Sequence, residues 1–296
     1  MYAVIIPSKN AANLIPCLTA LRKHEPDCPI VVVDDGIGQQ GIDAARFAGR
    51  VLIAAGSQPF VFARNVNLGI RYATTHWERP WPDESFDGYV LLNDDALLES
   101  PGGFTLLERT CAEHPEIAVL GATTNLTGQP LQQRIEGGGI YGAGIRGRLL
   151  DGLRFVPHMA FVCCYIPRRT INILAEYTDS EFQSHGGPKY HGSKYYSGGL
   201  LDERYVGYGC DDADYCEQVT RAGLLVAVHD GCFVDHASLK SSFRGDPTHG
   251  GDFSSNYRLL MQKWGRLITQ PDCLPPMSAE DAAKRARNAE ILGGAR

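Results

Sequence analysis

The first 120 residues alternate short apolar runs with longer amphipathic stretches, and this alternation constrains the fold more than any other feature. Runs of strand length occupy residues 3–7, 30–34, 51–54, 89–93 and 117–121. Apolar residues recur at helical spacing in the stretches 11–23, 63–76 and 103–113. Strands that alternate with helices favour a mostly parallel sheet covered by helices on both faces. The sequence therefore predicts an α/β fold with a Rossmann-like sheet.

The pattern changes after residue 121. Residues 132–155 are rich in glycine with interspersed isoleucines, which predicts twisted hairpins or loops. Further strands are expected at 159–166 and 224–228, and further helices at 168–177, 212–222, 252–264 and 278–292. Residues 179–199 lack periodicity and are interpreted either as a lid over a ligand or as a surface loop.

Length alone allows one large domain or two small ones. We expect one catalytic domain over residues 1–268, with a nucleotide-binding half (1–122) and an acceptor-binding half (123–268). A polar helical tail is expected at 269–296.

Charge and cysteine content disfavour several classes of protein. The formal net charge of -6 provides no basic footprint, which disfavours nucleic acid as the main partner. The apolar runs are too short to cross a bilayer, and the opening residues lack the basic start of a secretory signal. Nine scattered cysteines without CxxC spacing are typical of a reducing compartment. We therefore expect a cytoplasmic protein without a transmembrane segment.

Polar residues follow the predicted strands, at the sheet edge where α/β proteins bind ligands. Ser8 and Lys9 follow the first run, and Asp34 and Asp35 end the second. Carboxylates there can accept hydrogen bonds from a nucleotide base and ribose, although an Asp after a strand is also a common turn or capping residue.

A second acidic group, Asn93-Asp94-Asp95, follows the run at 89–93. Adjacent carboxylates repel each other unless a cation or donors neutralise them. Oxygen ligands of this kind suit Mg²⁺ or Mn²⁺, which also bridge diphosphate oxygens. A simple turn with two solvated acids is the structural alternative.

A third acidic group, Asp211, Asp212 and Asp214, opens a predicted helix after a glycine-rich turn. Acids favour helix N-termini for electrostatic reasons alone, but a general base at this place could also take a proton from a hydroxyl. His236 follows in a Val-Asp-His segment. Its imidazole suits Mn²⁺, although a lone histidine is more often structural.

Taken in order, these motifs resemble those of the glycosyltransferase family 2 group of GT-A enzymes. The segments that carry the resemblance are VIIPSKN at 4–10, VVVDDG at 31–36, ARNVNLGI at 63–70, NDD at 93–95, LDERY at 201–205, GCDDAD at 209–214 and KWG at 263–265. The block around Asp212, with His236 downstream, is similar to that of galactofuranosyl- and rhamnosyltransferase-like members. The resemblance covers residues 2–265 and implies a GT-A fold.

The resemblance also implies roles for single residues. It places the nucleotide of the donor, UDP first, against Pro7, Ser8, Lys9, Asp34, Asp35, Arg64 and Asp94, with Asp35 on the base, Asp94 on the ribose and Arg64 on the diphosphate. A divalent cation, Mn²⁺ or Mg²⁺, falls to Asp95 and His236. Asp212 is implied as the catalytic base, with Asp211 and Asn93 near the donor or acceptor sugar. Two departures are Asn93 in the first position of the DxD motif and Gly36-Ile37-Gly38 after the aspartates.

The sequence therefore predicts a metal-dependent glycosyltransferase that inverts the anomeric centre. Its expected partners are a nucleotide-sugar donor and a carbohydrate, lipid-linked or other hydroxyl acceptor. A retaining transferase, a nucleotidyltransferase and a non-catalytic nucleotide-sugar-binding protein are alternatives. Transfer to a modified nucleic-acid base ranks lower because of the negative charge.

Overall fold

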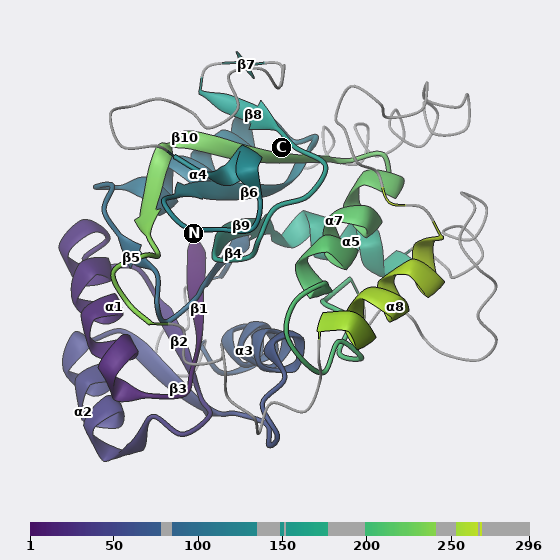
Figure 1. Cartoon of the computed structure of the whole chain (residues 1–296). Coiled ribbons are helices and arrows are strands. Elements are labelled where there is room, and N and C mark those ends of the chain that lie inside the picture. The colour runs from purple at the N-terminus through teal and green to yellow at the C-terminus, as the bar shows by residue number, and fades with distance from the viewer. Residues whose placement is uncertain are drawn as a thin grey trace.

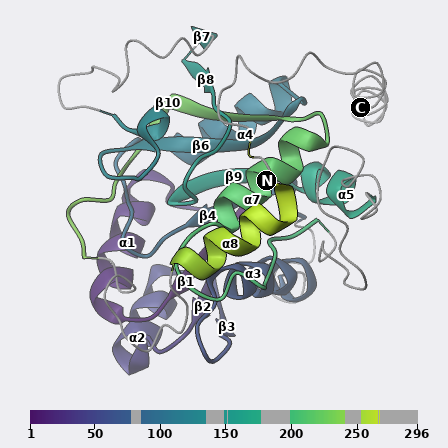
Figure 2. The same ribbon diagram turned by 45° about the vertical axis from the view of Figure 1, so that its right-hand side comes forward.

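The computed structural model describes residues 1–77, 85–134, 149–150, 152–176, 199–240, 253–265 and 267. A mixed β-sheet lies between two layers of helices (Figures 1 and 2). The predicted α/β architecture, with a largely parallel sheet flanked by helices, is confirmed.

The sheet has the strand order β3-β2-β1-β4-β9-β6-β10-β8-β7, and β5 pairs with β10 beside this path. Its strands are β1 Tyr2–Ser8, β2 Ile30–Asp34, β3 Val51–Ala55, β4 Gly88–Leu92, β5 Leu97–Leu98, β6 Ile117–Thr124, β7 Leu149–Leu150, β8 Leu153–Phe155, β9 Cys163–Pro167 and β10 Leu225–Asp235. The first four strands along this order pair in parallel, as do β6 and β10. Strand β9 lies antiparallel between β4 and β6, and β8 and β7 add an antiparallel edge.

Two groups of helices cover the two faces of the sheet. One group comprises α1 Ala11–His24, α2 Gly38–Ala48 and α4 Gly103–Glu113, and the other comprises α3 Phe62–His76, α5 Arg168–Glu176, α7 Asp211–Arg221 and α8 Phe253–Trp264. A short 3₁₀ helix, η1 Pro130–Gln132, follows β6.

Alternation along the strands builds one hydrophobic core on each face. In β1, Val4 and Ile6 pack with α1, whereas Ile5 packs with α3. All three side chains are fully buried, and each such burial is worth roughly 1.5–3 kcal/mol. Because both faces are covered, the strands are apolar throughout, as in other parallel sheets.

Several features differ from the sequence predictions, and one of them is that β9 begins at Cys163 and not at residue 159. Helix α2 was not predicted, and only Gly41 and Ala45 are buried in it, so its apolar stripe is narrow. Strand β10 continues to Asp235, well beyond the predicted end at residue 228. Polar residues at an irregularity between His229 and Phe233 interrupt the apolar run there. The short strand β5 is also absent from the prediction.

Several predicted segments lie outside the described residues. They are the loop at 179–199 apart from its last residue, the helix at 278–292, and most of the glycine-rich stretch at 132–155. From that stretch, β7 and β8 form the expected hairpin. Among the described helices, none is both long and apolar enough to span a bilayer.

Candidate active site

The loops after β1, β2 and β4 meet at one edge of the sheet. Ser8, at the end of β1, donates a hydrogen bond from Oγ to Asp94 Oδ2 at 2.8 Å. The amide of Asp35 donates to the Ser8 carbonyl at 2.9 Å, which extends the pairing of β1 and β2 by one residue. The structure therefore brings together the first two predicted acidic groups, with Ser8 between them.

Asp94 is almost fully buried. Burial raises the pKa of its carboxyl to about 6, although hydrogen bonds from Ser8 and the Lys9 backbone oppose this shift. Asp94 is therefore protonated more readily than an exposed aspartate, and a hydrogen-bond donor such as a hydroxyl group stabilises its carboxylate.

Asp34 and Asp35 have different surroundings. Asp34 Oδ1 accepts the amides of Gly36 and Ile37, both at 2.9 Å, so this side chain shapes the turn that leads into α2. Asp35 Oδ1 instead accepts a hydrogen bond from Gln58 Nε2 at 2.6 Å. Burial raises the pKa of Asp35 to about 6. Gln58 was missed by the sequence analysis, because nothing in the local pattern places it beside Asp35.

The two predicted metal ligands, His236 and Asp95, lie side by side. Their atoms Nε2 and Oδ1 are 3.2 Å apart, and both residues are buried. Asp235 pairs with Leu97 where β10 runs antiparallel to β5, so His236 follows β10 at the level of the loop that carries Asp95.

A second contact fixes the orientation of the His236 ring. Nδ1 lies 2.7 Å from the Leu126 carbonyl. A carbonyl only accepts hydrogen bonds, so Nδ1 carries a proton. Nε2 then faces Asp95 either with a second N–H, in the protonated ring, or with a lone pair, in the neutral ring. A lone pair facing a carboxylate at this distance requires a proton or a cation between them.

The donor atoms of this pair fit a divalent cation. A carboxylate oxygen with an imidazole nitrogen suits Mn²⁺, and the carbonyl behind His236 is the usual orienting contact of a metal-binding histidine. In the described part of the chain, no group of three His, Cys, Asp or Glu residues could hold a metal ion. A cation bound by Asp95 and His236 would therefore take further ligands from substrate oxygens and water, as Mg²⁺ commonly does.

The predicted base lies in the first turn of α7. Gly209 and Cys210 before it have positive φ angles of 79° and 76°, a sharp turn into the helix. Burial and the neighbouring charge of Asp212 raise the pKa of Asp211 to about 8. Burial likewise raises the pKa of Asp212, against hydrogen bonds from backbone amides that include that of Ala213, 2.7 Å from Oδ1.

The loop before β9 joins the two halves of the site. The amide of Asn93 donates to the Val162 carbonyl at 2.9 Å. Burial raises the pKa of the Asp212 carboxyl, and His158 and the Phe161 backbone both lower it. Neither Phe161 nor His158 was singled out from the sequence, where no motif marks them.

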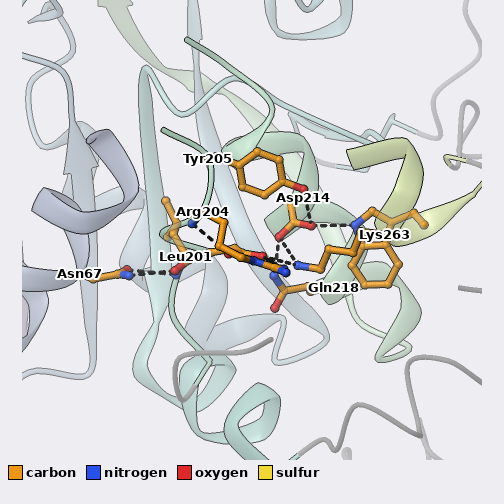
Figure 3. A network of polar contacts seen from close by, with 9 residues as sticks. Asn67, Leu201, Arg204, Tyr205, Asp214, Gln218 and Lys263 are labelled. Atoms are coloured by element: carbon orange, nitrogen blue, oxygen red, sulfur yellow. Dashed lines mark hydrogen bonds and ion pairs between the residues drawn. The ribbon is translucent and has the colours of Figure 1, made fainter. Parts of the chain in front are cut away.

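The third acid of the α7 group, Asp214, has a structural role (Figure 3). Its fully buried carboxylate accepts four hydrogen bonds, from Tyr205 at 3.1 Å, Gln218 at 2.8 Å, and Lys263 and Trp264 at 2.7 Å each. The KWG segment therefore attaches α8 to α7.

Arg64 lies where α3 meets the 201–204 segment. Its Nε is 3.6 Å from Glu203 Oε2. Nearby, Asn67 Nδ2 donates to the Leu201 carbonyl at 2.8 Å, and the Leu201 amide donates to Asn67 Oδ1 at 3.0 Å (Figure 3). The predicted contact of Arg64 with a diphosphate stays a prediction, as do the other ligand roles.

Comparison with solved structures identifies the architecture. The crystal structure of GalNAc-T7 with UDP, GalNAc and Mn²⁺ matches 88% of this chain with a TM-score of 0.59 and 12% identity. The mannosyltransferase PcManGT from Pyrobaculum calidifontis, in complex with GDP-Man and Mn²⁺, matches 100% of this chain with a TM-score of 0.57 and 13% identity. The chain has the GT-A fold.

The chain covers only part of the length of each of these two structures. It spans 47% of the GalNAc-T7 structure and 75% of the PcManGT structure. No protein-family model matches the sequence, and no curated protein matches it either. The resemblance to family 2 within the GT-A fold therefore stays a prediction.

Proposed function

We propose that this protein is a metal-dependent glycosyltransferase that moves a sugar from a nucleoside diphosphate sugar to an acceptor hydroxyl, with inversion. The proposal rests on the buried pair of Asp95 and His236, whose atoms Oδ1 and Nε2 are 3.2 Å apart. Asp95 of this pair follows the same strand end as Asp94, which is hydrogen-bonded to Ser8. Two proteins of the same fold are described with Mn²⁺ and with UDP or GDP-Man. UDP is the first donor class to test.

The nucleotide binds along the carboxyl ends of β1, β2 and β4. Asp35 accepts a hydrogen bond from the base, and Asp94 accepts one from the ribose. Asp34 shapes the loop through its turn, and Pro7, Ser8 and Lys9 form the wall of the pocket. Arg64 turns from Glu203 toward the diphosphate. Asp95 and His236 hold the cation, which supplies Lewis-acid neutralisation of the diphosphate when bound.

Asp212 is the general base. Its oxygen takes the proton of the acceptor hydroxyl while the hydroxyl oxygen forms a bond to the anomeric carbon. The bond from that carbon to the diphosphate breaks on the opposite face, and the diphosphate leaves with the bonding electrons. Burial raises the pKa of Asp212 and so strengthens it as a base. Asp211 and Asn93 flank the sugar.

A retaining transferase or a nucleotidyltransferase would also bind the nucleotide at the carboxyl ends of β1, β2 and β4, but it would not need Asp212 as a base. A non-catalytic nucleotide-sugar-binding protein would not need the base and would not turn over the donor. Product analysis separates these functions, because inversion gives the opposite anomer and nucleotidyl transfer releases pyrophosphate.

The test compares wild type with Asp212→Asn, using UDP-sugars and GDP-mannose with Mn²⁺ and a panel of glycan acceptors. We expect Asp212→Asn to lower transfer by about 10²–10⁴-fold, as loss of a general base does. UDP affinity should be unchanged, and wild type should give the inverted anomer. Asp43→Asn, an exposed change on α2, is the matched control. Full transfer by Asp212→Asn, or a retained anomer, would contradict the proposed mechanism.

A further inference from the structure

The turn that carries His236 lies beside the first residue after β6. Strand β6 ends at Thr124, and β10 ends at Asp235. Because Val234 pairs with Thr124 where the two strands run parallel, the register places Asn125 next to Asp235, one residue before His236. The side chain of Asn125 can therefore reach the turn.

The side-chain amide of Asn125 binds this turn at three points. Its Nδ2 donates a hydrogen bond to Asp235 Oδ1 at 2.8 Å. Its Oδ1 accepts the backbone amides of His236 at 2.9 Å and of Ala237 at 3.2 Å. The next residue in the chain, Leu126, supplies the carbonyl that lies 2.7 Å from His236 Nδ1. Residues 125 and 126 thus hold both the backbone and the ring of His236.

An asparagine after a strand often serves only the turn of its own loop. The loop after β6 is held by other groups. Thr127 Oγ1 accepts the Gln129 amide at 3.2 Å. The Arg134 amide donates to the Thr124 carbonyl at 2.7 Å and closes the base of the loop. The contacts of Asn125 with the end of β10 therefore call for a role beyond its own turn.

We propose that Asn125 is a positioning residue for cation binding: it aligns His236 so that Nδ1 meets the Leu126 carbonyl and Nε2 keeps a lone pair for the cation. This inference rests on the proposed function, in which Asp95 and His236 hold a divalent cation. Asn125 acts through His236 and needs no contact with the cation or the substrate.

The tautomer of the His236 ring explains why alignment matters. In a neutral imidazole one nitrogen carries the proton, and the hydrogen bond that this nitrogen makes determines which nitrogen is left to bind a metal. When Asn125 no longer ties the two segments together, the Leu126 carbonyl holds Nδ1 less firmly. The proton can then move to Nε2 and point at Asp95, and a protonated Nε2 has no lone pair for a cation.

The test measures Mn²⁺ affinity in the presence of UDP by electron paramagnetic resonance. Asn125→Ala should bind Mn²⁺ about tenfold more weakly, since contacts behind a metal ligand are worth 10–100-fold. Asn125→Ser keeps a hydroxyl for the amides but loses the N–H that Asp235 accepts, so its affinity should lie between those of Asn125→Ala and wild type.

Nitrogen NMR of metal-free protein labelled at histidine reads the tautomer directly, at about pH 8 where an ordinary histidine is neutral. His236→Ala assigns the signals. We expect the proton on Nδ1 in wild type and a share of it on Nε2 in Asn125→Ala. Thr127→Ala is the matched control, because it changes the same loop at a side chain that bonds Gln129. It should keep the affinity and the tautomer of wild type.

Circular dichroism verifies that each variant is folded, and if Asn125→Ala does not fold, Asn125→Ser carries the test. Wild-type Mn²⁺ affinity in the Asn125 variants, or weaker affinity with an unchanged tautomer, would overturn the inference. An equal loss in Thr127→Ala would also overturn it, because the effect would then belong to the loop as a whole. In each of these cases a loss of Mn²⁺ affinity in His236→Ala would leave the proposed function intact. Equal affinity in His236→Ala and wild type would instead overturn both.

Discussion

His236 Nε2 lies 3.2 Å from Asp95 Oδ1 because β10 pairs antiparallel with β5. The Leu126 carbonyl holds the opposite ring nitrogen at 2.7 Å. The sequence suggested each residue as a ligand, but only the strand pairing brings them together. The proposed metal dependence rests on this pair.

His236→Ala should weaken binding of Mn²⁺ in the presence of UDP by about tenfold or more, because even contacts behind a metal ligand are worth 10–100-fold. Electron paramagnetic resonance of free Mn²⁺ measures the affinity without any need for turnover. His114→Ala serves as the control. Equal Mn²⁺ affinity in His236→Ala and wild type would exclude His236 as a ligand.

Nucleotide binding should depend on the ionisation of Asp35. Burial raises the pKa of this carboxyl to about 6, so it becomes protonated as the pH falls through that value and then accepts the base N–H more weakly than the carboxylate does. UDP affinity should therefore decrease from about pH 7 to about pH 5. Measurements at saturating Mn²⁺ keep metal occupancy constant across the pH series.

Asp35→Asn is the variant that assigns this pH dependence. It should bind UDP more weakly at neutral pH and with a shallower pH profile. The remaining slope belongs to other groups of the cluster, such as Asp94, whose pKa is also raised by burial to about 6. A profile as steep as that of wild type would contradict the role of Asp35.

Lys263→Met should destabilise the fold by about 3–5 kcal/mol, because it leaves two buried carboxylates without their shared cation. Lys263 Nζ lies 2.7 Å from Asp214 Oδ2 and 3.0 Å from Asp202 Oδ2 (Figure 3). Urea denaturation measures the free energy of unfolding. The exposed Lys23→Met is the control, expected to change it by less than about 1 kcal/mol. A similarly small change in Lys263→Met would contradict the structural role of the KWG segment.

The sequence predicted those features that depend on local order. The strand run 30–34 ends in Asp34, and the run 89–93 is followed directly by Asp94 and Asp95. The rules of α/β sheets place such strand ends on one edge. The contact of Ser8 with Asp94 follows directly from the pairing of β1 with β4. The placement of these polar residues at one edge of the sheet could therefore be predicted.

Contacts between distant segments could not be predicted in the same way. Asp214 resembles its neighbours Asp211 and Asp212 in sequence, yet Lys263 and Trp264 from α8 occupy its carboxylate. His158 lies in a loop that no sequence motif marks, and it contacts Glu217 on α7. Such pairings arise from the packing of α7 against α8 and against the loop before β9, which no local periodicity encodes.

The central claim is that a nucleoside diphosphate binds at the edge of the sheet together with a divalent cation held by Asp95 and His236. Isothermal titration of UDP, GDP and dTDP, each with and without Mn²⁺, on wild type and Asp95→Ala tests it most directly, with Asp43→Ala as the control. The account predicts that one nucleotide, UDP first, binds wild type and Asp43→Ala tightly only with Mn²⁺, and that Asp95→Ala loses this metal-dependent binding. Absence of binding by all three nucleotides, or equal binding with and without Mn²⁺, would contradict it.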